Sequence, residues 1–169
     1  MKKIIEHISG SFLNSYENYR NDFIKHYVYW EEIPENIAMK FWKDYENILA
    51  KTLYKGLKQQ IEIKEDIEWY EILWYVDFWN DDVWIECKTK NGRRTKKEIK
   101  DSRQFRIYNY FKWDREFKIH QYNKKQQRYK VQSIGFEDKE FIPEIYCKIK
   151  EIENFLSDYD VSIWRNLNK

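Results

Sequence analysis

Two acids and a lysine stand where an apolar hairpin would normally place core residues. Residues 76–90, VDFWNDDVWIECKTK, read as a strand, a polar turn and a second strand that carry Asp77, Glu86 and Lys88. Side chains alternate along a strand, so Glu86 and Lys88 share one face, and a closed hairpin brings Asp77 beside the strand of Glu86. Such a cluster costs free energy inside an apolar sheet unless the charges pair or bind an ion.

A hard divalent cation would make this cluster favourable. Mg²⁺ takes oxygen ligands, usually one or two carboxylates together with waters and substrate phosphate. We therefore predict that Asp77 and Glu86 bind Mg²⁺ or Mn²⁺ and that Lys88 holds or polarises the attacking water. The alternative is an exposed hairpin face with a cross-strand ion pair, which contributes little stability.

The Glu-x-Lys spacing is not specific by itself. It occurs five times in the chain, starting at Glu62, Glu86, Glu98, Glu116 and Glu137. Only the copy at Glu86 lies in a strongly apolar segment that an acid precedes across a turn. The surroundings, and not the tripeptide, single out this copy.

Basic residues are concentrated in one part of the chain. Residues 86–130 hold 16 Lys and Arg against 5 Asp and Glu, although the net charge of the whole chain is only +2. Within them, RRTKK (93–97) and RQFRIYNYFKW (103–113) interleave basic with aromatic side chains. That mixture suits a polyanion with stackable bases; a solvated charged face is the other explanation. Trp79 and Trp113 are candidate stacking residues.

Several other classes of protein are excluded by composition. The chain has no run of eighteen apolar residues, so no transmembrane helix is expected, and its first ten residues do not resemble a signal peptide. Its four isolated glycines cannot form a phosphate-binding loop. Three scattered histidines and two distant cysteines, Cys87 and Cys147, favour neither a zinc site nor a secreted disulfide framework. We expect a cytoplasmic protein, in the host cytoplasm if a virus or phage encodes it.

The apolar periodicity predicts the element order α-α-β-β-β-α-β-β-α. Helices are expected over residues 11–29, from Pro34 to near Gly56, over 96–111 and over 143–156. Strands are expected within 61–79, at 83–88, and as a hairpin at 117–122 and 129–136. This order predicts an α/β (α+β) fold in which helices flank a mixed central β-sheet.

The Asp77, Glu86 and Lys88 pattern resembles the Asp…Glu-x-Lys signature of the PD-(D/E)xK nuclease superfamily, which has the restriction-endonuclease-like fold. YENILAKTL (45–53) resembles the first core helix of that family, where Glu46 would join the metal shell; a solvent-facing helix residue is its plain alternative. Gln104 and Tyr108 resemble the Gln-x-x-x-Tyr motif of the exonuclease branch, four residues apart on one helical face.

The resemblance implies a nuclease-like core at about residues 41–122, within a single domain of residues 1–169. Residues 1–40 would form a helical extension, and residues 123–169 a hairpin and a helix. The backbone carbonyl of Cys87 would be a further metal ligand, while its thiol is expected to be buried packing. Val76 departs from the family pattern, which has proline at this position.

The sequence therefore predicts a metal-dependent nuclease that hydrolyses phosphodiester bonds of DNA, with RNA left open as the substrate. The lack of a separate recognition domain favours structure- or end-directed cleavage. The alternatives are a non-catalytic nucleic-acid-binding module on the same fold and a protein-binding domain. A homodimer is a further expectation, and no membrane partner is expected. The residues predicted to contact nucleic acid are Lys90, Arg93, Arg94, Lys96, Lys97, Arg103, Gln104, Arg106 and Tyr108.

Overall fold

The computed structural model describes residues 7–29, 31–32, 34–67, 70–90 and 94–159, without the side chains of residues 7, 89 and 90. The chain divides into two compact units. The first unit contains Met1–Pro34, Lys64–Leu73 and Asp138–Lys169, and the second contains Glu35–Ile63 and Trp74–Glu137. Strands β2 (Lys58–Ile67) and β3 (Tyr70–Trp79) run from one unit into the other. The single domain predicted from the sequence stays a prediction.

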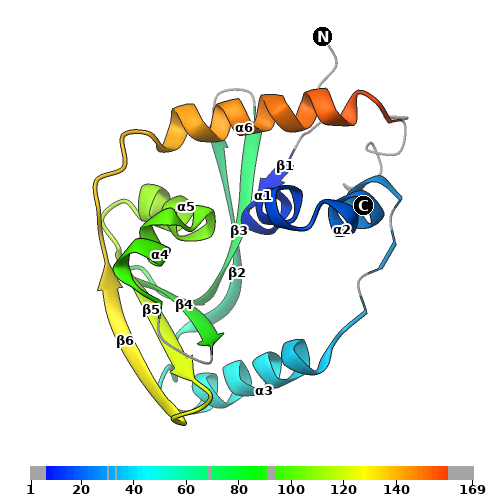
Figure 1. Ribbon diagram of the computed structural model, residues 1–169. Helices are drawn as coiled ribbons and strands as arrows, with labels where there is room; N and C mark the ends of the chain where they lie inside the picture. The colour runs from blue at the N-terminus through cyan, green and yellow to red at the C-terminus, as the bar shows by residue number, and fades with distance from the viewer. Residues whose placement is uncertain (1–6, 30, 33, 68–69, 91–93, 160–169) are drawn as a thin grey trace. The chain divides into compact units, whose positions relative to one another are not determined.

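The strands of the described residues form one six-stranded sheet (Figure 1). Its order is β1 (His7–Ser9), β3, β4 (Val83–Lys90), β5 (Glu116–Asn123) and β6 (Arg128–Ile134), and β2 also pairs with β3. The β1–β3 and β4–β5 pairs are parallel, whereas the β3–β4 and β5–β6 pairs are antiparallel. The predicted class, a mixed sheet flanked by helices, is confirmed.

The helix that carries Glu46 is shorter than predicted at both ends. Helix α3 spans Ile37–Lys51, because the side chain of Asn36 accepts the backbone N–H of Met39 at 2.9 Å and so caps its first turn. The predicted start at Pro34 is therefore wrong. The predicted end near Gly56 is also wrong, since the backbone leaves the helical region at Thr52, where φ is −118° and ψ is −91°.

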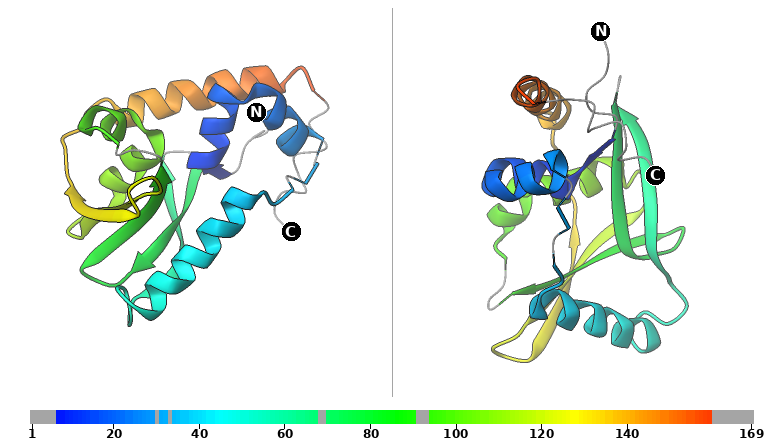
Figure 2. Two further views of the ribbon diagram at one scale, coloured as in Figure 1. Left: turned by 60° about the horizontal axis from the view of Figure 1, so that its bottom comes forward. Right: turned by 90° about the vertical axis from the view of Figure 1, so that its right-hand side faces the viewer.

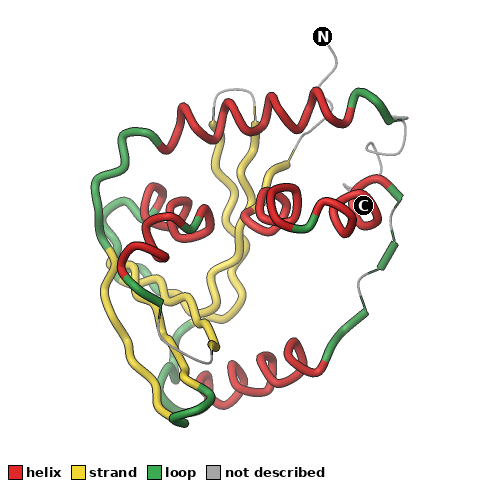
Figure 3. The backbone as a smooth tube through the Cα atoms, in the orientation of Figure 1, coloured by secondary structure: helices red, strands yellow, loops and turns green. Residues whose placement is uncertain are grey.

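Two other predicted helices are interrupted (Figure 3). Residues 96–111 form α4 (Lys96–Asp101) and α5 (Arg103–Phe111), because Ser102 has an extended backbone with φ −76° and ψ 118°. Residues 11–29 likewise divide at Tyr19, where φ is −139°. They form α1 (Gly10–Asn18), α2 (Arg20–Phe23) and a π-helix, η1 (Ile24–Val28).

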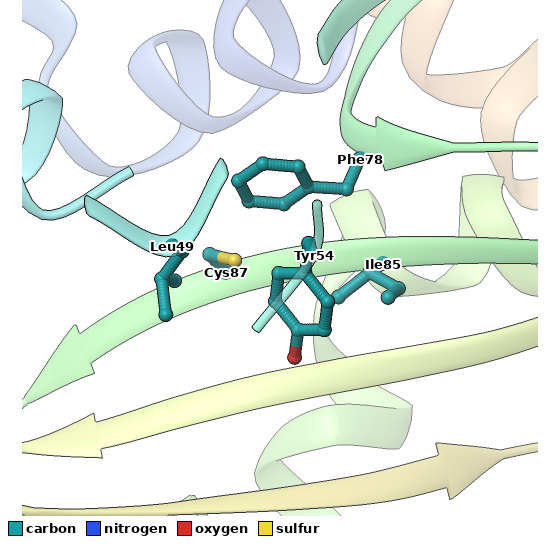
Figure 4. Close-up of a cluster of buried hydrophobic side chains, with 5 residues drawn as sticks. All are labelled: Leu49, Tyr54, Phe78, Ile85 and Cys87. Carbon is teal, nitrogen blue, oxygen red and sulfur yellow. The ribbon is translucent and has the colours of Figure 1, made fainter. Parts of the chain in front are cut away.

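In the second unit, α3 and α5 cover opposite faces of the β4–β5 pair. Leu49 and Tyr54 pack with Phe78, Ile85 and the thiol of Cys87 (Figure 4). The alternate residues of β4 and β5, whose side chains point to the other face of the sheet, face α5 instead. The ring of Tyr108 on α5 contacts that of Phe117 on β5 at 5.2 Å, and the ring of Phe111 stacks on Trp74 at 4.8 Å. Cys87 is fully buried, as predicted for a packing thiol.

The first unit is held together by aromatic side chains and by helix α6 (Phe141–Leu156). Tyr16 of α1 contacts Phe155 of α6 edge-to-face at 5.5 Å, and Phe12 contacts Phe23 at 5.1 Å. The buried face of α6 follows the helical period through Ile145, Ile149 and Ile152. Figure 2 shows the long paired strands β2 and β3 from two further directions. None of the helices in the described residues is long and apolar enough to cross a bilayer.

Candidate active site

Asp77 lies beside the strand of Glu86, as the hairpin geometry predicts. The β3–β4 register pairs Phe78 with Ile85 and Trp79 with Trp84. One residue further along, Oδ2 of Asp77 accepts the backbone N–H of Cys87 at 2.8 Å. Asp77 is only 8% exposed, so this bond fixes a buried carboxylate against β4. Its other oxygen, Oδ1, points to the amide group of Gln60 at 3.0 Å.

Glu86 is the most buried acid of the cluster, at 2% exposed. Its Oε1 accepts from the ammonium group of Lys88 and from Nε2 of Gln104, the latter at 2.9 Å. The same Nε2 lies 2.9 Å from the hydroxyl of Tyr108, which donates to the backbone carbonyl of Tyr75 at 2.7 Å. Gln104 and Tyr108 of α5 therefore orient Glu86 through one continuous hydrogen-bond chain.

Glu46 reaches the same cluster through Gln60, a residue that was not predicted from the sequence. Nε2 of Gln60 donates to Oε2 of Glu46 and to Oδ1 of Asp77, both at 3.0 Å. Gln60 also has a left-handed backbone with φ 48°, a conformation that costs a residue with a side chain about 1–3 kcal/mol. Its segment, KQQIEIKED, carries no motif that distinguishes this glutamine from its neighbour, Gln59.

The three carboxyl groups hold their protons unusually tightly. Burial, together with the charge of Asp77, raises the pKa of Glu86 to about 8 despite the opposing effect of Lys88. Burial, followed by the charge of Asp77, raises the pKa of Glu46 to about 7. Burial also raises the pKa of Asp77, against the opposing effects of Lys88 and the Cys87 N–H. For each of the three carboxyl groups, burial therefore outweighs the attraction of Lys88.

The side chain of Lys88 stays charged in this environment. Burial alone would lower the pKa of the ammonium group, but the charges of Glu86 and Asp77 outweigh burial and raise it. The side chain of Lys88 is 25% exposed, against 3% for that of Glu86. Lys88 is therefore the charged group of this trio that solvent or a substrate can reach most easily.

The fit of a metal ion can be tested on the donors themselves. In the described part of the chain, no three His, Cys, Asp or Glu side chains converge closely enough to form a ready-made metal site. Instead, an amide group lies between Glu46 and Asp77, and an ammonium group lies against Glu86. Oε2 of Glu86 is buried without a hydrogen-bond partner. The oxygen atoms of these carboxyl groups are of the donor type that Mg²⁺ and Mn²⁺ take in proteins.

The predicted nucleic-acid contacts are unequally exposed. Lys96 and Lys97 are exposed at the start of α4, whereas Arg94 and Arg103 are half-buried. Arg106 is 9% exposed, which leaves little of its surface for a phosphate. Arg93 and the side chain of Lys90 lie outside the described residues. Gln104 is half-buried and Tyr108 is buried, and both belong to the carboxylate cluster described above.

A buried histidine, also not identified from the sequence, joins α3 to the sheet beside the site. Nε2 of His120 lies 2.9 Å from the hydroxyl of Tyr45, and Nδ1 lies 2.7 Å from that of Tyr54. Burial lowers the pKa of His120 to about 4, so the ring is neutral and satisfies both phenols. Because Tyr45 precedes Glu46 on α3, this arrangement also fixes the position of the acid. The role of His120 follows only from its contact partners in the structure, because no spacing motif in the sequence marks this residue.

Comparison with known proteins identifies a related fold without a family. No family model matches the chain, and no curated protein matches it. The crystal structure of SSO0001 aligns with a TM-score of 0.60 at 15% identity, covering 91% of this chain and 80% of that one. A "putative exonuclease" from Eubacterium rectale aligns with a TM-score of only 0.37 at 12% identity, covering 87% of this chain and 64% of that one. The first match shows a shared fold; the second is too distant to support an argument.

Proposed function

We propose that this protein is a metal-dependent nuclease that hydrolyses phosphodiester bonds of DNA in a structure- or end-directed manner. The observation that carries the proposal is the convergence of Asp77, Glu86 and Lys88 at one buried position of a hairpin. Buried acids with raised pKa values beside a lysine are typical of functional sites. A purely structural hairpin gains nothing from this cluster, because each buried carboxyl costs desolvation free energy.

The ligands proposed for the metal are Asp77, Glu86 and the backbone carbonyl of Cys87, with Glu46 as a further carboxylate. When bound, Mg²⁺ or Mn²⁺ supplies Lewis-acid activation of water and neutralises charge on the phosphate. The Cys87 N–H holds Asp77, and Gln104 with Tyr108 holds Glu86, so both acids keep their orientation. Lys88 would position the attacking water and stabilise the negative charge that develops on the phosphodiester.

The exposed lysines at the start of α4 would contact the backbone phosphates of the substrate. Lys96 and Lys97 are available for this role, and half-buried Arg94 and Arg103 would contribute less. Binding that depends on such contacts weakens steeply as salt rises, because counterions are released on association. A DNA affinity that does not change with salt would contradict this part of the proposal.

The test compares wild-type protein with Glu86→Gln and Lys88→Met on end-labelled linear, nicked and branched DNA in Mg²⁺. Both variants should lose cleavage by at least about 100-fold and keep DNA binding, since removing one group that stabilises charge in the transition state commonly costs that much. Glu116→Gln is the matched control. It breaks a Glu-x-Lys pair of the same spacing on β5, where Glu116 and Lys118 lie 2.7 Å apart in solvent.

Each result separates the candidate functions. Cleavage lost in Glu86→Gln but kept in Glu116→Gln supports the nuclease. Equal binding by all variants with no cleavage by any of them supports the non-catalytic nucleic-acid-binding module. A wild-type protein that does not bind DNA even at low salt refutes both and leaves the protein-binding domain.

A further inference from the structure

A cluster of tryptophan rings around one arginine lies two residues along the hairpin from the carboxylates. Trp79 and Trp84 pair across β3 and β4, and by strand alternation they share faces with Asp77 and Glu86. Two residues of a strand span about 7 Å.

Trp113 completes the cluster from the end of α5. Its ring meets that of Trp84 edge-to-face at 6.4 Å, and 56% of Trp113 remains exposed. The guanidinium carbon of Arg115 lies 5.5 Å from the Trp113 ring, 5.7 Å from the Trp84 ring and 6.0 Å from the Trp79 ring. Nε of Arg115 is buried without a hydrogen-bond partner. Trp84 is only 1% exposed, so it packs against Trp113 and Arg115 and offers no stacking face of its own. We call the cluster of Trp79, Trp84, Trp113 and Arg115 the tryptophan platform; its exposed ring is that of Trp113.

The backbone of Trp113 is unusual for its residue type. Its φ is 48°, in the left-handed region that a helix commonly adopts just after its last turn and that glycine normally occupies there. A tryptophan at such a position costs about 1–3 kcal/mol of backbone strain. Contacts with Trp84 and Arg115 hold the exposed ring in place against this strain. Backbone strain of this kind clusters at ligand-binding sites.

Backbone hydrogen bonds within the second unit connect the turn that carries Trp113 to helix α5 and to the β3–β4 turn. The N–H of Lys112 donates to the carbonyl of Tyr108 at 3.0 Å, and the N–H of Arg115 donates to the carbonyl of Lys112 at 2.9 Å. The N–H of Glu116 donates to the carbonyl of Asp82 in the β3–β4 turn at 2.9 Å. The platform is therefore held at a set distance from the carboxylates.

The charges around the platform favour a base over a phosphate as its occupant. Exposed acids flank the arginine in sequence at Asp114 and Glu116, and two more, Asp81 and Asp82, stand in the adjoining turn. Two cations lie among these acids: Lys58 is 4.8 Å from the Trp79 ring, and Lys118 pairs with Glu116 at 2.7 Å. With the acids so close, electrostatic attraction for a polyanion is weak here. An aromatic ring, however, can stack on any of the bases, whatever the sequence of the strand.

We propose that the tryptophan platform stacks an unpaired nucleobase and thereby directs the protein to single-stranded ends or flaps. The choice of nucleic acid as the ligand rests on the proposed nuclease function. Bases inside a duplex have both faces covered by their neighbours, so only an unpaired or terminal base can lie on Trp113. The platform thus selects the strand end that would enter the carboxylate cluster.

The test measures binding of a fluorescent dT oligonucleotide and of an abasic oligonucleotide of equal length, in EDTA so that no cleavage occurs. Trp113→Gly should weaken binding of the dT oligonucleotide by roughly 5- to 150-fold, the range for loss of one stacked base, and leave abasic binding unchanged. Trp113→Phe should keep most of the affinity. Trp113→Gly removes the ring and suits the left-handed backbone, so its thermal unfolding should show that the loss is not a folding defect.

Equal dT affinity in wild type and Trp113→Gly overturns the proposal, as does an equal loss on both oligonucleotides. A change in oligomeric state with unchanged dT binding would instead make the platform an interface between copies and also overturn it. A wild-type protein that binds neither oligonucleotide removes the basis for it. Failure of the nuclease proposal is visible separately, as wild-type protein that binds dT in EDTA but never cleaves DNA in Mg²⁺.

Discussion

Raising the pH from 6.5 to 8 should destabilise the metal-free protein through its buried carboxyl groups. In the unfolded chain, Glu86 and Glu46 have the ordinary pKa of 4.5, so both are already ionised throughout this range. In the folded protein their pKa values are about 8 and about 7, so the folded state still binds protons that the unfolded state has lost. Stability therefore falls as pH rises, until the folded groups also ionise.

The size of the fall follows from these two pKa values. One pKa unit corresponds to about 1.4 kcal/mol, and together the two groups lose about 2 kcal/mol between pH 6.5 and 8, most of it from Glu86. For a chain of this length the melting temperature should drop by about 4–8 °C. His120 opposes this fall only slightly. Its pKa is lowered to about 4 in the folded protein, so loss of the proton from the half-protonated imidazole of the unfolded chain adds about 0.4 kcal/mol of stability between pH 6.5 and 8.

The measurement is thermal or urea unfolding in EDTA at several pH values, for wild type and Glu86→Gln. Glutamine keeps the shape of the side chain without an ionisable group, so the variant should lose more than half of the pH dependence. Glu116→Gln serves as the control and should keep all of it, since Glu116 is exposed. A wild-type stability that is flat from pH 6.5 to 8, or a Glu86→Gln profile parallel to wild type, would refute the argument.

The other predictions address the metal, the bridging amide and the anchor of α3. Saturating Mg²⁺ at pH 8 should raise the melting temperature of wild type but not of Glu86→Gln, because only a folded site binds the ion; equal shifts would contradict this. In thermal unfolding, the Gln60→Glu variant should be less stable than wild type in EDTA and should regain that stability in Mg²⁺. A variant whose stability does not respond to Mg²⁺ would contradict this prediction. Tyr45→Phe should cost about 1 kcal/mol in urea unfolding through its lost bond to His120, and Phe78→Ala about 3–5 kcal/mol through a cavity; neutral results would contradict these contacts.

The sequence by itself determined the class of the fold and the position of the three central residues. Alternation of side chains along residues 76–90 is a local property, and the apolar residues around Asp77 and Glu86 require them to pair across a polar turn. The exact helix ends were not determined in this way. Helix α3 begins after its cap at Asn36 and ends before Thr52, and the extended backbone of Ser102 separates α4 from α5. Apolar periodicity does not detect such capping and backbone geometry.

Only the tertiary structure decided which polar residues accompany the central three. Gln60 and His120 lie in segments without a recognisable motif, and they act because the fold brings them to Glu46, Asp77 and Tyr45. Gln104 and Tyr108 could be proposed from their spacing, but their contacts with Glu86 and the Tyr75 carbonyl depend on how α5 packs on the sheet. Burial is also a tertiary quantity: it raised the pKa values of the acids and removed Arg106 from the accessible basic surface. Sequence spacing describes neighbours along the chain, whereas desolvation and hydrogen bonding depend on neighbours in space.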